Sequence, residues 1–316
     1  MTEVLSALDR RIVGALQMDG RAPWSVVAKA LDEPLRTVAR RGRDLVDSGA
    51  ARVVALPNLG PTCVIEITCL PARIDSLARE LAQHPGVVFA LVLANPSRLL
   101  VEVHEQSFDL ATMTLEVIPG FAGVAEVSAA PVLRYWKTNA DWRPGLLTAA
   151  EAGRLEAAAR PEESTAAPEP LDGADRAIVD ALVTDGRTAV AELAAAAGVT
   201  EPTARRRLAD LRERGAFAIR TLVDPAALGY GVEAWLRIDC SPQHADRVGE
   251  ALAAQPESRY VAQVLGEYAL VAQLSARDLP HVRELLSRGW IREVRGLRSS
   301  LVTRAHKRSG YLTRAI

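Results

Sequence analysis

The chain reads DRRIVGALQMDGR at residues 9–21 and DRAIVDALVTDGR at residues 175–187, so one motif occurs twice, 166 positions apart. Around this motif, residues 8–52 align with residues 174–218 without a gap and are identical at 18 of 45 positions. The similarity continues faintly as far as Lys137 and Lys307, near the end of each copy. The chain is therefore an internal duplication, and its fold has to be assigned one copy at a time.

Each copy begins with a pattern that predicts three short helices. Apolar residues recur at helical spacing in the first helix, and Gly20 and Gly186 are expected at the C′ positions that end it. In copy two, Gly198 forms a tight turn before the third helix. This arrangement is typical of a helix-turn-helix, and a strand after it would make the motif winged. The later helices are predicted at 26–31, 34–48, 190–197 and 200–214, and the strands at 52–56 and 217–222.

The third predicted helix of each copy carries the charge expected of a recognition helix. Arg36 and Arg40 are four residues apart and share one helix face. In such a helix the N-terminal residues reach base edges in the major groove, while arginines bind guanines or phosphates. A solvated basic face is the alternative, but the cluster occurs in both copies, so we predict contact with double-stranded DNA. The predicted DNA-binding residues are Arg36, Thr37, Arg40, Arg41, Arg43, Thr203, Arg205, Arg206 and Arg207.

The two helix-turn-helix motifs are not equivalent. Copy one has Asp32 in place of the turn glycine, and it places Gly42 inside the third helix, which costs about 1 kcal/mol relative to alanine. Copy one is therefore expected either to read DNA less rigidly or to serve mainly in assembly.

The remainder of each copy alternates strands and helices in the order βαββαβ. Ala234, Leu236 and Ile238 alternate with polar neighbours, as in a strand that buries one face. The order predicts an α+β fold in which each helix-turn-helix is followed by a ferredoxin-like domain with one uncovered sheet face. A second copy, from the same chain or from another chain, would cover that face. The predicted elements are 62–69, 73–83, 87–94, 99–104, 108–117 and 124–136, then 232–240, 244–255, 258–265, 269–274, 276–288 and 291–303.

A linker rich in proline and glutamate separates the copies at residues 161–170. Just before it, Thr148 and Glu151 form a capping-box pattern that predicts a helix at 148–159. A basic tail could add phosphate contacts or could simply be solvated; its residues are Arg298, Arg304, Lys307, Arg308 and Arg314. The predicted domains are a helix-turn-helix at 1–56, a ferredoxin-like domain at 57–140, a helix and linker at 141–170, a second helix-turn-helix at 171–222, and a second ferredoxin-like domain at 223–316.

Composition narrows the class of protein. The net charge of −1, from 38 Lys+Arg and 39 Asp+Glu, excludes a uniformly basic nucleic-acid binder, so a DNA site must be a local patch. The three cysteines lack C-x-x-C spacing, which favours buried thiols in a reducing compartment. Residues 1–10 lack the apolar core of a signal peptide, and no apolar run approaches the ~20 residues of a membrane helix. We therefore expect a cytoplasmic protein without membrane contact.

Taken together, the repeated opening motif, the arginine-rich third helix and the βαββαβ order resemble the Lrp/AsnC (leucine-responsive and asparagine-responsive) transcription factors. The resemblance covers both halves and implies a transcriptional regulator that assembles as a homodimer or higher homo-oligomer through the sheet domain. It also implies an amino acid or other small-molecule effector. The family's effector loop corresponds to Gly266, Glu267 and Tyr268 in copy two, whereas copy one has Asn95-Pro96-Ser97-Arg98 there. A simple hairpin turn is the alternative interpretation of this loop.

Two other functions fit the same pattern. Siroheme decarboxylases resemble this fold, including the helix-turn-helix, but they should gather histidines and aromatic residues in a tetrapyrrole cleft. Here the five histidines are scattered and aromatic residues make up 4% of the chain, so we predict a binding protein that is not an enzyme and has no metal or other cofactor. A co-regulator that senses metabolites without binding DNA is the remaining alternative.

Overall fold

The computed structural model describes residues 4–104, 109–155 and 170–313, which fall into two units. The first, which we call the helix unit, contains Thr2–Asn58 and Arg143–Gly229. The second, the sheet unit, contains Leu59–Trp142 and Tyr230–Ile316. Each unit therefore takes one part from each half of the duplicated sequence, and the predicted α+β class is confirmed.

The helix unit holds two motifs of three helices and one strand, with a short extra helix beside them. In the turn before the third helix, both Asp32 (φ 55°) and Gly198 (φ 66°) adopt the left-handed conformation, so the aspartate replaces the glycine without changing the turn. The elements of the helix unit are α1 (Ala7–Met18), α2 (Trp24–Leu31), α3 (Leu35–Asp47), β1 (Ala51–Pro57), α6 (Ala149–Gly153), α7 (Gly173–Thr184), α8 (Val190–Ala197), α9 (Glu201–Glu213), β6 (Phe217–Val223) and the 3-10 turn η4 (Pro225–Leu228).

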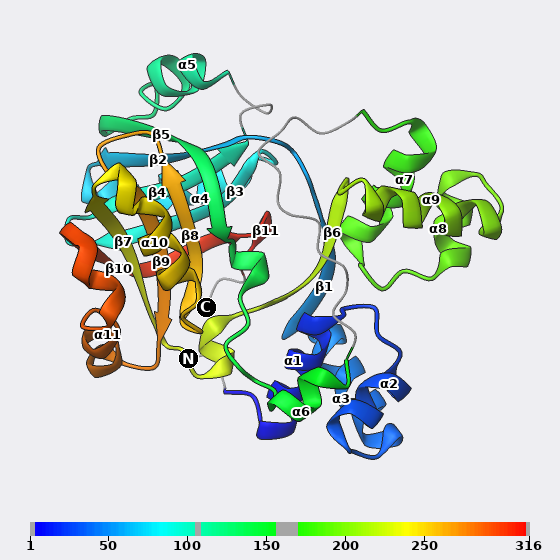
Figure 1. The fold of residues 1–316 in the computed structure, drawn as a ribbon. Helices are drawn as coiled ribbons and strands as arrows, with labels where there is room; N and C mark the ends of the chain where they lie inside the picture. The colour runs from blue at the N-terminus through cyan, green and yellow to red at the C-terminus, as the bar shows by residue number, and fades with distance from the viewer. Residues whose placement is uncertain (1–3, 105–108, 156–169, 314–316) are drawn as a thin grey trace. The chain divides into compact units, whose positions relative to one another are not determined.

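Strands β1 and β6 form a two-stranded antiparallel sheet, side by side in Figure 1. Val54 lies opposite Arg220, and these positions are equivalent in the duplicated sequence, so the pairing is symmetric. An approximate two-fold axis therefore relates the two helix-turn-helix motifs. The prediction of wings was wrong: each strand pairs with its counterpart from the other half, because a lone strand leaves its backbone hydrogen-bonding groups without partners.

The repeated Asp-Gly-Arg sequence holds this pair together. Arg21 donates to the carbonyl oxygens of Gly186 and Thr188, and Arg187 donates reciprocally to those of Gly20 and Ala22. Gly20 and Gly186 do not adopt the left-handed conformation expected of C′ glycines. They allow a close approach instead, since a Cβ on Gly186 would lie 2.8 Å from the backbone nitrogen of Val54.

Gly42 also has a packing role that its sequence context did not reveal. A Cβ at this position would lie 2.3 Å from the ring of Trp24, so the indole fills the space that a side chain would need. The second half has Val190 and Leu208 at the two equivalent positions. The first half thus has a large residue on its second helix and glycine on its third, whereas the second half has medium-sized residues on both helices. The total volume of the packed side chains is roughly conserved.

Helix α6 packs against the first helix-turn-helix motif. The predicted capping box is confirmed, with Thr148 and Glu151 bonding reciprocally to each other's backbone, but the helix ends at Gly153. Residues 156–159 of the predicted helix, and 161–169 of the predicted linker, lie outside the described residues. Glu151 also accepts a hydrogen bond from Arg11 Nε at 2.8 Å, which ties α6 to α1.

The sheet unit contains two series of strands and helices in the predicted order. Helix α5 continues into one π-helical segment, η2; the start of the predicted helix, at residue 108, lies outside the described residues. The elements are β2 (Thr62–Cys69), α4 (Pro71–Ala82), β3 (Val87–Ala94), β4 (Arg98–His104), α5 (Leu110–Thr112), η2 (Met113–Val117), β5 (Val124–Lys137), η3 (Asn139–Asp141), β7 (Val232–Cys240), α10 (Pro242–Ala253), β8 (Ser258–Val264), β9 (Leu270–Ala276), α11 (Leu279–Leu285), η5 (Gly289–Glu293), β10 (Val294–Arg308) and β11 (Tyr311–Leu312).

Among the described residues, eight strands of the sheet unit close into a barrel in the order β10-β3-β4-β2-β5-β8-β9-β7, with β7 pairing back to β10. The long last strand of each half makes the closure. Strand β5 pairs first with β2 and then with β8, while β10 pairs first with β7 and then with β3. The two halves therefore cover each other's open sheet face within one chain, which settles the alternative that the sequence left open.

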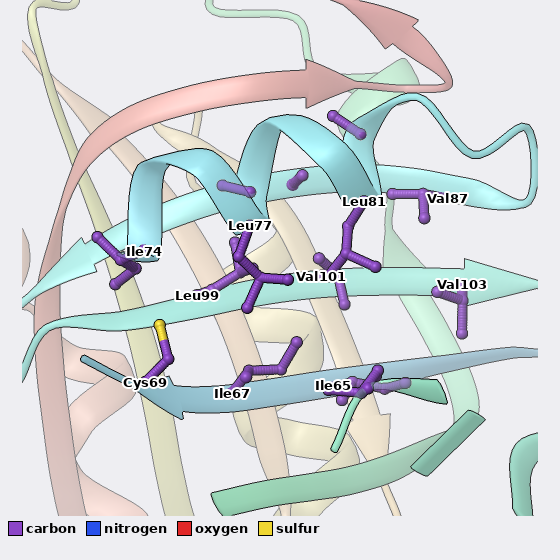
Figure 2. Close-up of a cluster of buried hydrophobic side chains, with 14 of the residues drawn as sticks. Ile65, Ile67, Cys69, Ile74, Leu77, Leu81, Val87, Leu99, Val101 and Val103 are labelled. Atoms are coloured by element: carbon purple, nitrogen blue, oxygen red, sulfur yellow. The ribbon is translucent and has the colours of Figure 1, made fainter. Parts of the chain in front are cut away.

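Each half packs its helices on the outer face of its strands. Figure 2 shows this for the first half, where Ile74, Leu77 and Leu81 of α4 point toward the strands beneath. Because side chains alternate along a strand, the neighbours of these outer residues point into the barrel. The inner cluster draws on both halves and comprises Val64, Phe89, Leu91, Leu93, Leu100, Val132, Trp235, Tyr260, Ala262, Val264 and Val271.

Glu102 is a buried carboxyl group within this interior. It is 3% exposed, and the hydroxyls of Tyr135 and Tyr260 both donate to its Oε1 at 2.7 Å. Burial raises the pKa of Glu102 above its ordinary value, because a charged carboxylate is poorly solvated there. The second half has Gln273, a neutral residue of the same shape, at the corresponding position of β9.

We expect Glu102→Gln to stabilise the protein increasingly as pH rises from the ordinary pKa of a glutamate, 4.5, toward the raised pKa of Glu102 in the folded protein. In that range the folded wild type retains a proton that the unfolded chain has released, so its stability falls with rising pH. When the two states differ by one bound proton, the free energy of unfolding changes by about 1.4 kcal/mol for each pH unit. Urea unfolding of both proteins at pH 4, 6 and 8 measures the difference, and a difference independent of pH would contradict the expectation.

Candidate DNA interface

The third helix of each motif exposes arginines on the side opposite its core contacts. Arg36, Arg40 and Arg43 of α3 are exposed, as are Arg205 and Arg206 of α9. The opposite sides are anchored by buried residues; these are Val38 and Leu45 on α3, and Ala204, Leu208 and Leu211 on α9. Both helices thus present a basic outer face that is fixed by the packing of their inner face.

These arginines are only weakly engaged within the protein. Arg40 pairs with Asp44 at 3.2 Å, but both side chains are about two-thirds exposed, and such pairs contribute little. Arg36, Arg205 and Arg206 make no ion pair with other residues in the described ranges. The guanidinium groups are therefore available for phosphates or bases.

Two of the predicted DNA-binding arginines have another role. Arg41 binds Asp9 at 2.7 Å, and Arg207 binds Asp172 and Asp175 at 2.7 and 2.8 Å. Hydrogen bonds from Arg41 lower the pKa of Asp9 below its ordinary value, because they stabilise the carboxylate. These ion pairs join the third helix to the first in both halves, so Arg41 and Arg207 have a structural role. Contact of the same two side chains with DNA stays a prediction. Asp9 and Asp175 are identical between the copies, and this was the signal available in the sequence.

The predicted threonines lie at the N-terminal end of the same helices and are half-buried. Thr203 Oγ1 is 3.0 Å from the hydroxyl of Thr200, which occupies the N-cap position of α9 without bonding to its backbone. Thr37 occupies the equivalent position on α3. Thr37 directly follows Arg36, and Thr203 lies two residues before Arg205.

The predicted effector loop forms the turn between β8 and β9. Arg298 Nη1 donates to the Tyr268 hydroxyl at 2.6 Å and lies 3.2 Å from Glu267. Gly266 lies close to Ala130 of the first half, since a Cβ there would be 3.3 Å from the Ala130 Cβ. The loop thus places a phenol, a carboxylate and a guanidinium together at an exposed edge of the sheet unit.

The expected basic tail is instead part of a strand. Arg298, Arg304, Lys307 and Arg308 lie on β10, and their partners are Glu267, Asp75, the His84 carbonyl and Glu233. Arg314 lies outside the described residues. Since β10 crosses to the first half, Arg304 and Lys307 join the two halves of the sheet unit. Arg298 and Arg308 instead pair within the second half.

The histidines, cysteines and helices can be compared with the arrangements that metal sites and membrane spans require. No group of three or more His, Cys, Asp or Glu side chains in residues 4–104, 109–155 and 170–313 has a metal-binding arrangement. His281 is buried 3.3 Å from Glu257, and His306 lies 3.0 Å from Asp75. The three cysteines are buried free thiols. Over the same ranges, every helix is too short or too polar to cross a membrane.

Comparison with known proteins identifies the family. The AsnC-type helix-turn-helix domain matches residues 5–46 and again residues 171–212, and the Lrp/AsnC ligand binding domain matches residues 233–312. The HTH-type transcriptional regulator FL11 of Pyrococcus horikoshii is 30% identical over 140 residues, which cover 93% of that protein and 44% of this chain. The chain belongs to the Lrp/AsnC family. FL11 of Pyrococcus furiosus also matches at 30% identity, over 92% of its own length and 43% of this Lrp/AsnC chain, so a whole relative corresponds to one half.

A solved structure matches nearly the whole of this Lrp/AsnC chain. The siroheme decarboxylase NirDL, in complex with an iron-uroporphyrin III analogue, aligns over 96% of this chain and 93% of its own, with a TM-score of 0.63 and 16% sequence identity. At this identity the likeness shows a shared fold.

Proposed function

We propose that this protein is a sequence-specific DNA-binding transcriptional regulator in which one chain supplies the pair of recognition helices. Each half would comprise a helix-turn-helix followed by a ferredoxin-like domain. The observation that carries the proposal is the symmetric pairing of two such motifs, each with exposed arginines on its third helix. Arginine presents a planar fork that matches guanine edges and phosphate oxygens. The names of the Lrp/AsnC relatives support the same function.

We further propose that the sheet unit binds a small-molecule effector, such as an amino acid. The match to the Lrp/AsnC ligand binding domain supports this, and Gly266, Glu267 and Tyr268 are the candidate contacts. A charged amine would pair with Glu267 and a carboxylate with Arg298. Assembly into a homodimer or higher homo-oligomer stays a prediction. A thermal-shift screen of amino acids would detect an effector.

The DNA-binding function is tested by a fluorescence-anisotropy titration of the full chain on the region upstream of its own gene. We expect the affinity to fall about tenfold or more when salt rises from about 0.1 to 0.2 M, because each phosphate contact releases counterions. A competitor duplex of shuffled sequence should be bound more weakly than the upstream region. Equal affinity for both duplexes would argue against sequence-specific recognition, and absence of binding to either would favour the co-regulator.

The alternative function is a siroheme-decarboxylase-like enzyme. The observation that favours this alternative is the fold that the chain shares with NirDL. Two histidines already have partners in the fold, since His281 faces Glu257 and His306 faces Asp75. Mixing the protein with siroheme and recording the visible spectrum separates the two functions. We expect the spectrum of the mixture to equal the sum of its components; a shifted absorption band would support the enzyme.

A further inference from the structure

The outward faces of α3 and α9 carry different side chains at equivalent positions. Of five outward positions in each helix, the arginine of the Arg40/Arg206 pair is the shared residue. On α9 the five residues together line a shallow hollow. In order, the positions hold Leu35, Arg36, Ala39, Arg40 and Arg43 on α3, and Glu201, Pro202, Arg205, Arg206 and Ala209 on α9.

The differences lie on the surface and not in the supporting core. Leu35 is 51% exposed although it is a large apolar residue at the start of α3, whereas Glu201 is an exposed acid in the same place on α9. By contrast, the ion pairs of Arg41 and Arg207 with the first helix are kept in both halves. The fold is therefore duplicated while the exposed face has diverged.

The outward faces of α3 and α9 belong to one unit with approximate two-fold symmetry, the helix unit. The β1–β6 register and the reciprocal hydrogen bonds of Arg21 and Arg187 fix the two motifs to each other around an approximate two-fold axis. Two helices related in this way approach a duplex in inverted orientations, as those of a homodimer do at a palindrome. Here the two helices are chemically unlike.

The exposed groups favour different bases. Arg205 suits a guanine edge and Glu201 suits the amino group of cytosine, whereas Leu35 and Ala39 suit the methyl group of thymine. Arg36 and Arg43 add two cations to the first helix that the second lacks at these positions. Arg40 and Arg206 can make the same contact in both half-sites.

From this we infer that one chain recognises a non-palindromic duplex made of two unlike half-sites in inverted orientation. The half-sites share the contact made by Arg40 and Arg206 and differ at neighbouring base pairs. The five outward positions of each helix are the specificity-determining residues. This inference rests on the proposed DNA-binding function.

The test is selection of bound sequences from a randomised duplex pool by the full-length protein. We expect the wild type to enrich a motif with two distinct inverted halves. Its affinity for that motif should exceed its affinity for a palindrome of either half by about tenfold or more, since a single mismatched base pair already has an effect of this size.

Two reciprocal variants give the matched comparison. The first transfers the α9 face to α3 with Leu35→Glu, Arg36→Pro, Ala39→Arg and Arg43→Ala; the proline is placed where α9 tolerates Pro202, in the first turn. The second transfers the α3 face to α9 with Glu201→Leu, Pro202→Arg, Arg205→Ala and Ala209→Arg. Each variant should select a palindrome, and the two palindromes should be built from the two halves of the wild-type motif. Thermal unfolding confirms that both variants are folded.

The outcomes separate the inference from the proposed function. A palindromic wild-type motif, or a motif with one half-site, overturns the inference and leaves DNA binding in place. Variants that are folded and select the unchanged wild-type motif also overturn it. Failure of the wild type to enrich any sequence overturns the proposed function itself.

Discussion

Replacing Arg205 and Arg206 with alanine should lower the affinity for DNA by at least about 30-fold while leaving the protein folded. Both side chains are exposed on α9, so their removal takes away two cationic contacts without opening the core. A single arginine bound to a base contributes about 1–3 kcal/mol, and the loss of two should be at least the sum of the smaller values. Fluorescence anisotropy on the upstream region measures the effect.

The matched control is the double variant Arg277→Ala and Arg283→Ala. These arginines are exposed in the sheet unit, and their removal changes the net charge by the same amount. The control should bind with nearly wild-type affinity, because neither arginine belongs to the proposed DNA interface and salt screens exposed charges that make no direct contact. An equal loss of affinity in both double variants would mean that total charge, and not α9, governs binding.

Gly186→Ala should destabilise the helix unit by about 1–3 kcal/mol and weaken DNA binding about tenfold or more. The N–H of Gly186 donates to the Val53 carbonyl oxygen at 2.9 Å, so its backbone is held against β1. An added Cβ would lie 2.8 Å from the Val54 nitrogen and 2.9 Å from its Cα. Backbone atoms cannot rotate away as a side chain does, so Gly186 and β1 must move apart, and the two third helices then lose their fixed relation.

Gly173→Ala is the control for this substitution. Gly173 begins α7, and a Cβ there meets no atom within 4 Å, so stability should change by less than about 0.5 kcal/mol. Chemical denaturation followed by circular dichroism at 222 nm, with anisotropy on the same DNA, compares the two variants. If Gly186→Ala matched Gly173→Ala in both measurements, the close approach would not be what joins the motifs.

The sequence predicted the elements well where periodicity and turn residues agreed. Strand Val232–Cys240 and strand Thr62–Cys69 have the predicted bounds, since alternation and flanking turns both define them. Helix ends varied: α8 has the predicted bounds, α3 and α9 are one residue shorter at each end, and α11 is confined to Leu279–Leu285 although 276–288 was predicted. Local patterns place the body of a helix better than its ends, where tertiary contacts decide how far it continues.

What the sequence could not show were contacts between distant segments. Arg41 and Arg207 matched a recognition helix by position, yet their partners, Asp9 and Asp175, lie more than thirty residues earlier in the chain. In the same way, Arg21 seemed only to follow a helix end, although it binds the other half. A charge cluster on one helix does not reveal which of its members face a carboxylate and which face solvent.

The pairing of β1 with β6 has a consequence for how occupancy depends on dilution. A regulator made of two separate subunits dissociates at low copy number. The occupancy of its DNA site then varies more steeply than linearly with its concentration. In this chain the two strands are tethered, so each always meets the other at a high local concentration. Promoter occupancy by a single chain should follow a simple hyperbola down to a few molecules per cell, whereas the predicted assembly of several chains would make it steeper.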